Sequence, residues 1–182
     1  MSDTSLVNAA TPAMGGRGRS ETATERRQYL TFTLRREPYA IGILNIKEII
    51  EYGQVTEVPM VPDFIRGVIN LRGAVLPVID LASRFGKPPS ETTRRTCIVV
   101  LEVEGNGKNH DVGIVVDAVN EVLEIADNDI EAAPEFGTNI STEFIAGMGN
   151  VGGRFVILLN VHKVLSVDEL AAAVALSPSA EA

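Results

Sequence analysis

Residues 64–85 read FIRGVINLRGAVLPVIDLASRF, and residues 144–165 read FIAGMGNVGGRFVILLNVHKVL. The two stretches share Phe, Ile, Gly, Asn and Gly in the same order and at the same spacing, and seven further positions are apolar in both. Apolar strands often resemble one another by chance, whereas Gly and Asn residues in matching places do not. The pair therefore indicates an internal duplication.

A weaker match precedes the first one, because IGILNIKEIIE at 41–51 is similar to IVVDAVNEVLE at 114–124. We expect two similar subdomains, one near 28–90 and the other near 94–166, joined by the polar, Pro-rich residues 86–95. Each half begins with a hairpin, over 29–34 and 39–43 in the first half and over 97–103 and 112–116 in the second. Short strands with Gly corners favour a mainly β fold of two small barrels.

One segment in each half has apolar residues at helical spacing. Residues 46–50 predict a short helix-like turn, with Glu48 pointing away from the apolar stripe. Residues 117–125 fit either such a turn or a bent strand.

The composition excludes several classes of function. The chain has 16 Lys and Arg against 24 Asp and Glu, and the net charge of −8 opposes a phosphate-binding face. Trp is absent, so a base-stacking surface is not expected, and two His with one Cys cannot build the usual Cys/His zinc site. The lone Cys97 indicates a reducing compartment, and residues 1–27 predict a disordered tail without a signal-peptide core. We therefore expect a cytoplasmic protein.

No group of residues predicts catalysis. The G-x-G-x-x-G pattern at 147–152 precedes the strand-like RFVILLNV, whereas a nucleotide site needs a helix there. We expect His110 and His162 to be solvated and Cys97 to be a packed thiol. Because no nucleophile, base and electrophile occur together, we expect a partner-binding protein without enzyme activity, metal or cofactor.

Two arginines lie just inside the corner glycines of the first copy, at Arg66 and Arg72, where the second copy has Ala and Gly. An arginine pair in only one copy favours a functional role, since Arg is common in interfaces. The alternative is that Arg72 pairs with a local acid, Glu48 or Asp80, and only stabilises the fold.

The segment RGVINLRGAVLPVIDL (66–81) resembles the CheW family of bacterial chemotaxis coupling proteins. YLTFTL, YAIGILNIKEII, DVGIVVDAVNEVL, APEF and VILLNVHKVL extend the resemblance over 28–170, leaving 1–27 and 171–182 as tails. It implies two five-stranded β-barrel subdomains, SH3-like or OB-like, around a shared core with short helices. It also implies a non-catalytic adaptor that couples chemoreceptors (methyl-accepting chemotaxis proteins) to a CheA-type histidine kinase.

The resemblance implies site residues and partners as well. Three residues match positions tied to receptor contact, and Arg66 beside them makes a fourth candidate: Ile46, Glu48, Arg72 and Arg66. Three others match positions in the second subdomain that affect coupling: Cys97, Gly113 and Val122. The implied partners are the regulatory domain of the kinase, the cytoplasmic tip of the receptors and other CheW-like domains in array rings. Neither nucleic acid nor direct membrane insertion is expected.

Three alternatives remain. An OB-like nucleic-acid binder is disfavoured by the charge, and a small enzyme using an inter-barrel cleft lacks a nucleophile–base pair. The same module could serve an array that controls twitching or biofilm, which the sequence does not separate from swimming chemotaxis. The 27 residues before the module and the 12 after it leave no room for a receiver or kinase domain, so we expect the stand-alone form.

Overall fold

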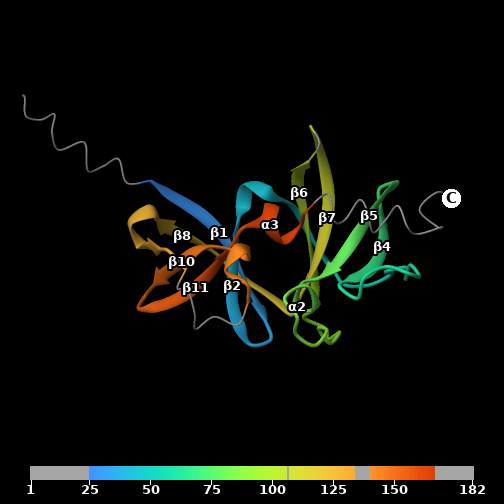
Figure 1. Ribbon diagram of the computed structural model, residues 1–182, viewed down its shortest axis with the longest axis horizontal. Coiled ribbons are helices and arrows are strands. Elements are labelled where there is room, and N and C mark those ends of the chain that lie inside the picture. Colours follow the sequence, from blue (N-terminus) through green and yellow to red (C-terminus); the bar gives the residue numbers. More distant parts are fainter. Residues whose placement is uncertain (1–24, 106, 134–139, 167–182) are drawn as a thin grey trace, which may run out of the picture.

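The computed structural model describes residues 25–105, 107–133 and 140–166, which form two β-sheets and a few short helices (Figure 1). One sheet has six strands in the order β8-β1-β2-β11-β10-β9, namely Ala118–Ala126, Arg26–Leu34, Glu37–Gly42, Arg154–Leu159, Ile145–Val151 and Ile130–Glu131. The other has five strands in the order β3-β6-β7-β5-β4, namely Ile46–Glu51, Cys97–Gly105, Lys108–Val116, Ala74–Asp80 and Ile65–Leu71. The helices are α2 (Leu81–Arg84), α3 (Val161–Val164), η3 (Ile43–Asn45), η4 (Asp127–Asp129) and η5 (Thr142–Phe144). The predicted mainly β class is confirmed, and so are both predicted hairpins.

The two halves of the chain exchange their first hairpins. The β1–β2 hairpin of the first half pairs with β8 and β11 of the second half. Reciprocally, the β6–β7 hairpin of the second half pairs with β3 and β5 of the first. Each sheet therefore draws strands from both halves, and the expected division into 28–90 and 94–166 does not follow the sheets.

The duplication is visible in local detail. β4 and β10 each contain a register shift at their second residue, and each ends in a turn closed by an Asn side chain. The Asn70 Oδ1 atom accepts the Gly73 N–H at 2.9 Å, and Asn150 Oδ1 accepts the Gly153 N–H at 3.1 Å. Both glycines have positive φ, 87° and 85°, a conformation that costs Gly little. These requirements explain why Asn and Gly recur in both copies.

Three apolar clusters hold the sheets together. The largest lies between the sheets and includes residues of both sheets and both α-helices. Four of its aromatic rings follow one another across it, with centroids 5.5–6.1 Å apart, in the order Phe32, Tyr39, Phe85 and Phe144. A smaller cluster lies within the five-stranded sheet, and another lies within the six-stranded sheet. Each sheet thus has its own interior and also contributes one face to a shared core.

Two local expectations differ from the structure. Residues 46–50 are part of strand β3, and the only helical turn there is η3, just before it. Pairing with β6 provides hydrogen bonds that an isolated turn lacks, so tertiary structure overrides the helical spacing. Along β3, Glu48 is half-buried like Ile46 and does not point away from the apolar side chains. Strand β1 begins at Arg26, so the last two residues of the expected tail belong to the sheet.

The segment 117–125 lies almost entirely in the strand β8 (Ala118–Ala126), and a strand was one of the two forms considered for it. The G-x-G-x-x-G pattern at 147–152 is followed by the strand β11 and not by a helix, as expected. Among the described residues, no helix has the length and apolar character to cross a lipid bilayer.

Candidate functional site

An ion pair on the surface of the five-stranded sheet joins two of the predicted site residues. The Arg72 guanidinium donates two hydrogen bonds to the Glu48 carboxylate, at 2.6 Å from Nη1 to Oε1 and 3.2 Å from Nη2 to Oε2. The Arg72 side chain is 73% exposed and that of Glu48 is 26% exposed. The pair is therefore accessible from solvent and presents a fixed, planar charge arrangement.

The topology of the sheet explains how these residues meet. Glu48 lies on β3 and Arg72 lies in the turn after β4, and these strands are the two edges of the sheet. A bridge between Thr56 and Val68 brings the segment after β3 against β4, so that the sheet curls and its edges approach. Arg72 has a positive φ of 53° in its two-residue turn. The ion pair thus links the two edges of a closed sheet.

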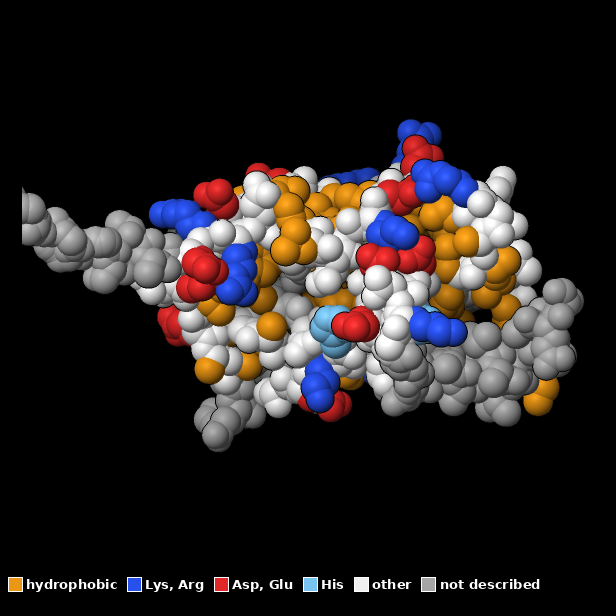
Figure 2. All heavy atoms as spheres, turned by 90° about the horizontal axis from the view of Figure 1, so that it is seen from above, with side chains coloured by type: hydrophobic (Ala, Val, Ile, Leu, Met, Phe, Trp, Pro, Cys, Tyr) orange, Lys and Arg blue, Asp and Glu red, His pale blue; other side chains and the backbone are white. Residues whose placement is uncertain are grey.

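Further charged and apolar side chains surround this pair. Lys47, next to Glu48, forms a second ion pair with Asp111 on β7, at 3.1 Å. The hydrogen bond with Glu48 raises the pKa of Arg72, and the bond with Asp111 raises the pKa of Lys47, so both cations remain charged. Exposed apolar side chains occur on the neighbouring η3 and β5, namely Leu44 and Val75, while the exposed Ile49 alternates with Glu48 and lies on the opposite face of β3. Figure 2 shows one face of the molecule, on which charges of both signs lie beside hydrophobic patches.

Ile46, the third receptor-contact candidate, begins β3 two residues before Glu48 and is half-buried against the shared core. We define the Glu48–Arg72 surface as Ile46, Glu48 and Arg72 with the exposed Leu44 and Val75. The first three were predicted by resemblance. The exposed apolar residues were not predicted as part of a site, because apolar residues in strands and short turns are usually buried.

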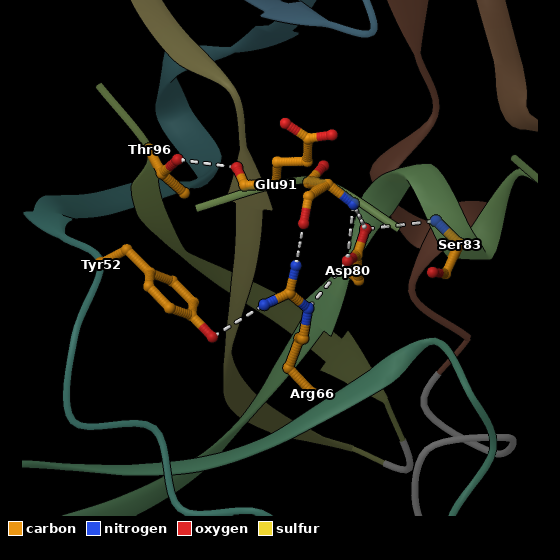
Figure 3. A network of polar contacts seen from close by, with 7 residues as sticks. Tyr52, Arg66, Asp80, Ser83, Glu91 and Thr96 are labelled. Carbon is orange, nitrogen blue, oxygen red and sulfur yellow. Dashed lines mark hydrogen bonds and ion pairs between the residues drawn. The ribbon is translucent and has the colours of Figure 1, made fainter. Parts of the chain in front are cut away.

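Arg66, the fourth candidate, is not part of this surface. It is the extra residue at the register shift in β4, and such a bulge turns a side chain in a new direction. Its Nε donates to Asp80 Oδ2 at 2.8 Å, its Nη1 donates to the Tyr52 hydroxyl at 2.9 Å, and its Nη2 donates to the Ser90 carbonyl oxygen (Figure 3). The Arg66 side chain is 21% exposed and Asp80 is fully buried. We define Tyr52, Arg66, Asp80 and Ser90 as the Arg66 network.

The electrostatics of this network support a structural role. Burial lowers the pKa of Arg66, but the hydrogen bond and charge of Asp80 outweigh burial and raise it overall. The Asp80 carboxylate also accepts the backbone N–H groups of Ser83 and Ser90. The network thereby fixes the segment after α2 to β4 and β5. Of the two acids considered as partners of Arg72, Glu48 pairs with it, whereas Asp80 pairs with Arg66 instead.

The candidates assigned to the second subdomain do not come together. Cys97 on β6 and Gly113 on β7 lie in the five-stranded sheet with β3, whereas Val122 lies on β8 of the other sheet. A Cβ atom on Gly113 would lie 2.7 Å from a side-chain carbon of Ile98, so this position requires Gly for packing. Cys97 is half-buried and burial raises its pKa, as expected for a packed thiol. Only Val122, 50% exposed, presents a side chain for contact.

The described residues contain no cluster of three or more His, Cys, Asp or Glu that could hold a metal ion. His162 is exposed, as predicted. His110 differs from expectation, because it is half-buried on β7 and its Nε2 is 3.1 Å from the Gly105 carbonyl oxygen. The APEF segment lies partly outside the described residues.

Comparison with known proteins identifies the family. The family model described as a CheW-like domain matches residues 28–169. The chain is 42% identical over 148 residues to the chemotaxis protein CheW of Klebsiella aerogenes, covering 81% of this chain and 87% of that protein. It is 34% identical to the Bacillus subtilis chemotaxis protein CheW, covering 80% and 90%. The crystal structure of the scaffolding protein TtCheW from Thermoanaerobacter tengcongensis superposes with a TM-score of 0.70 at 33% identity, covering 78% and 88%. The chain therefore belongs to the CheW-like domain family.

Proposed function

We propose that this chain is a non-catalytic adaptor that couples chemoreceptors to a CheA-type histidine kinase, and that the Glu48–Arg72 surface contacts the receptor. The carrying observation is the accessible, bidentate ion pair that joins the edges of the five-stranded sheet. Its neighbours supply exposed apolar area, and a rigid charged pair beside apolar side chains suits a protein interface.

The relatives named above are called chemotaxis proteins and a scaffolding protein, which supports the same role. An adaptor works by binding two partners at once, so each weak contact raises the effective concentration for the other. The kinase and other CheW-like domains would contact other surfaces, and Val122 is our candidate there. We place the protein in the cytoplasm, held at receptor arrays through its partners.

Binding to a receptor cytoplasmic fragment tests the proposal. We expect Arg72→Ala and Glu48→Ala to lower capture of the fragment at least about tenfold while the thermal midpoint changes little, because exposed pairs contribute about 1 kcal/mol or less. Arg27→Ala is the matched control, since it removes an exposed arginine of the other sheet whose carboxylate partners, Glu25 and Asp127, lie 3.5 and 3.8 Å away. Equal capture by all three variants and the unmodified protein would rule out this surface.

A further inference from the structure

The turn between β1 and β2 has an unusual sequence for its shape. Leu34 pairs with Glu37, so only Arg35 and Arg36 form the turn, and both have positive φ, 52° and 71°. Two-residue turns of this kind strongly prefer Asn-Gly, because residues with a Cβ atom are strained there. The matching hairpin of the duplicated half has Asn106-Gly107 in its sequence at this place. The arginines therefore occupy the turn against its conformational preference, which indicates a role for their side chains.

These arginines line a hollow of about 460 Å³ together with Glu91, Thr93 and Asp117. Two more exposed arginines, Arg94 and Arg95, follow Thr93 directly. Figure 1 shows the β1–β2 turn and the segment after α2 at the lower edge of the molecule, away from the β4–β5 turn that carries Arg72. We use the name arginine hollow for this hollow together with Arg35, Arg36, Arg94 and Arg95.

The four arginine side chains form no ion pair within the described part of the chain, although the protein carries a net charge of −8. The carboxylate of Asp117 uses Oδ2 to accept the Arg35 backbone N–H at 2.8 Å. Its Oδ1 atom is buried and has no hydrogen-bond partner among the described residues. The hollow therefore presents unpaired guanidinium groups, whereas the free Asp117 oxygen is enclosed by the protein.

We propose that the arginine hollow binds a carboxylate-rich peptide segment of a partner protein. Guanidinium groups bind carboxylates in a planar, two-bond geometry, and Arg35 and Arg36 both line the hollow. A nucleic acid fits less well, because none of the residues that line the hollow is aromatic and bases could not stack there. This surface is separate from the Glu48–Arg72 surface, so the inference does not depend on the proposed receptor contact.

Fluorescence anisotropy with a labelled octa-glutamate peptide tests the proposal, using octa-glutamine and an eight-nucleotide single-stranded DNA as comparison probes. The decisive variant is Arg35→Asn with Arg36→Gly, which removes both charges and also installs the residues that the turn prefers. We expect its dissociation constant for octa-glutamate to rise at least about tenfold, with an unchanged or higher thermal midpoint. Arg94→Gln with Arg95→Gln should weaken binding as well.

The matched control is Arg26→Gln with Arg154→Gln, which removes two exposed arginines from the six-stranded sheet and gives the same net charge. This control should bind octa-glutamate within about twofold of the unmodified protein. Equal weakening by the control would show that only total charge matters and would overturn the proposal. Tighter binding of DNA than of octa-glutamate, or no binding of the peptide at low salt, would overturn it as well.

Discussion

Replacing Arg66 with Ala removes the partner of a fully buried carboxylate. Asp80 then keeps only two backbone donors, the N–H groups of Ser83 and Ser90 at 3.2 and 3.1 Å. Removing one partner of a buried ion pair costs about 3–5 kcal/mol, because the remaining charge stays desolvated and uncompensated. For a domain of this size, about 4 °C per kcal/mol corresponds to a fall of about 12–20 °C in the thermal midpoint.

Arg72→Ala is the matched comparison, because it breaks an ion pair of the same type at an exposed site. We expect it to cost about 1 kcal/mol or less, or about 4 °C. Urea unfolding and thermal melts of both variants measure the difference. Combining Arg66→Met with Asp80→Asn should recover part of the loss, since it removes the buried charge and keeps an amide oxygen that can accept the Ser83 N–H. Equal, small losses for Arg66→Ala and Arg72→Ala would refute a structural role of the Arg66 network.

Three further predictions concern single positions. Gly67→Ala should lower the free energy of unfolding by about 2–4 kcal/mol in urea titrations, because Gly67 has a φ of 152° and its new Cβ would collide with the Thr56 carbonyl oxygen. Burial raises the pKa of Tyr39 in the folded protein, so stability should be complete below the ordinary tyrosine pKa of 10.0 and should fall as pH rises above it; Tyr39→Phe should reduce that fall in denaturation at pH 8 and pH 11. Burial and the charge of Glu51 raise the pKa of Cys97, so the thiol should react slowly with a disulfide reagent at pH 8, and Glu51→Gln should accelerate the reaction without changing the fold.

Local sequence patterns predicted the strands and hairpins of this fold better than they predicted which strands pair with one another. The repeated Phe, Ile, Gly, Asn and Gly predicted equivalent hairpins because Asn closes the same turn and Gly has positive φ in both copies. The same patterns do not state which sheet a hairpin joins, because the alternation of apolar residues along a strand does not specify its pairing partner. The exchange of hairpins is therefore a property of tertiary packing. The spacing of Ile46, Ile49 and Ile50 suggested a helical turn for a related reason, since β6 supplies the pairing that makes it a strand.

The candidate site was predictable in part. Glu48 and Arg72 came from resemblance to a family motif, and their pairing was foreseen as one of two local options. Arg66 has the same residue type in the same segment, yet a bulge turns it toward Asp80 rather than toward the surface. A register shift of one residue cannot be recognised from the residue types in the segment. The sequence therefore did not show that one arginine is exposed and the other is part of a buried network. The strained turn at Arg35 and Arg36 likewise became visible only through its backbone angles.

Exchanging the two charges of the surface pair tests the proposed receptor contact most directly. The double variant Glu48→Arg with Arg72→Glu keeps the charges opposite and allows the ion pair to re-form across the sheet edges, so its thermal midpoint should stay within a few degrees of the unmodified protein. A receptor that binds this charged pair would then face charges of reversed sign. Capture of the receptor fragment should therefore remain at least about tenfold lower than for the unmodified protein, as in the single variants. Recovery of capture to the level of the unmodified protein would show that the pair only stabilises the fold and would contradict the proposed contact.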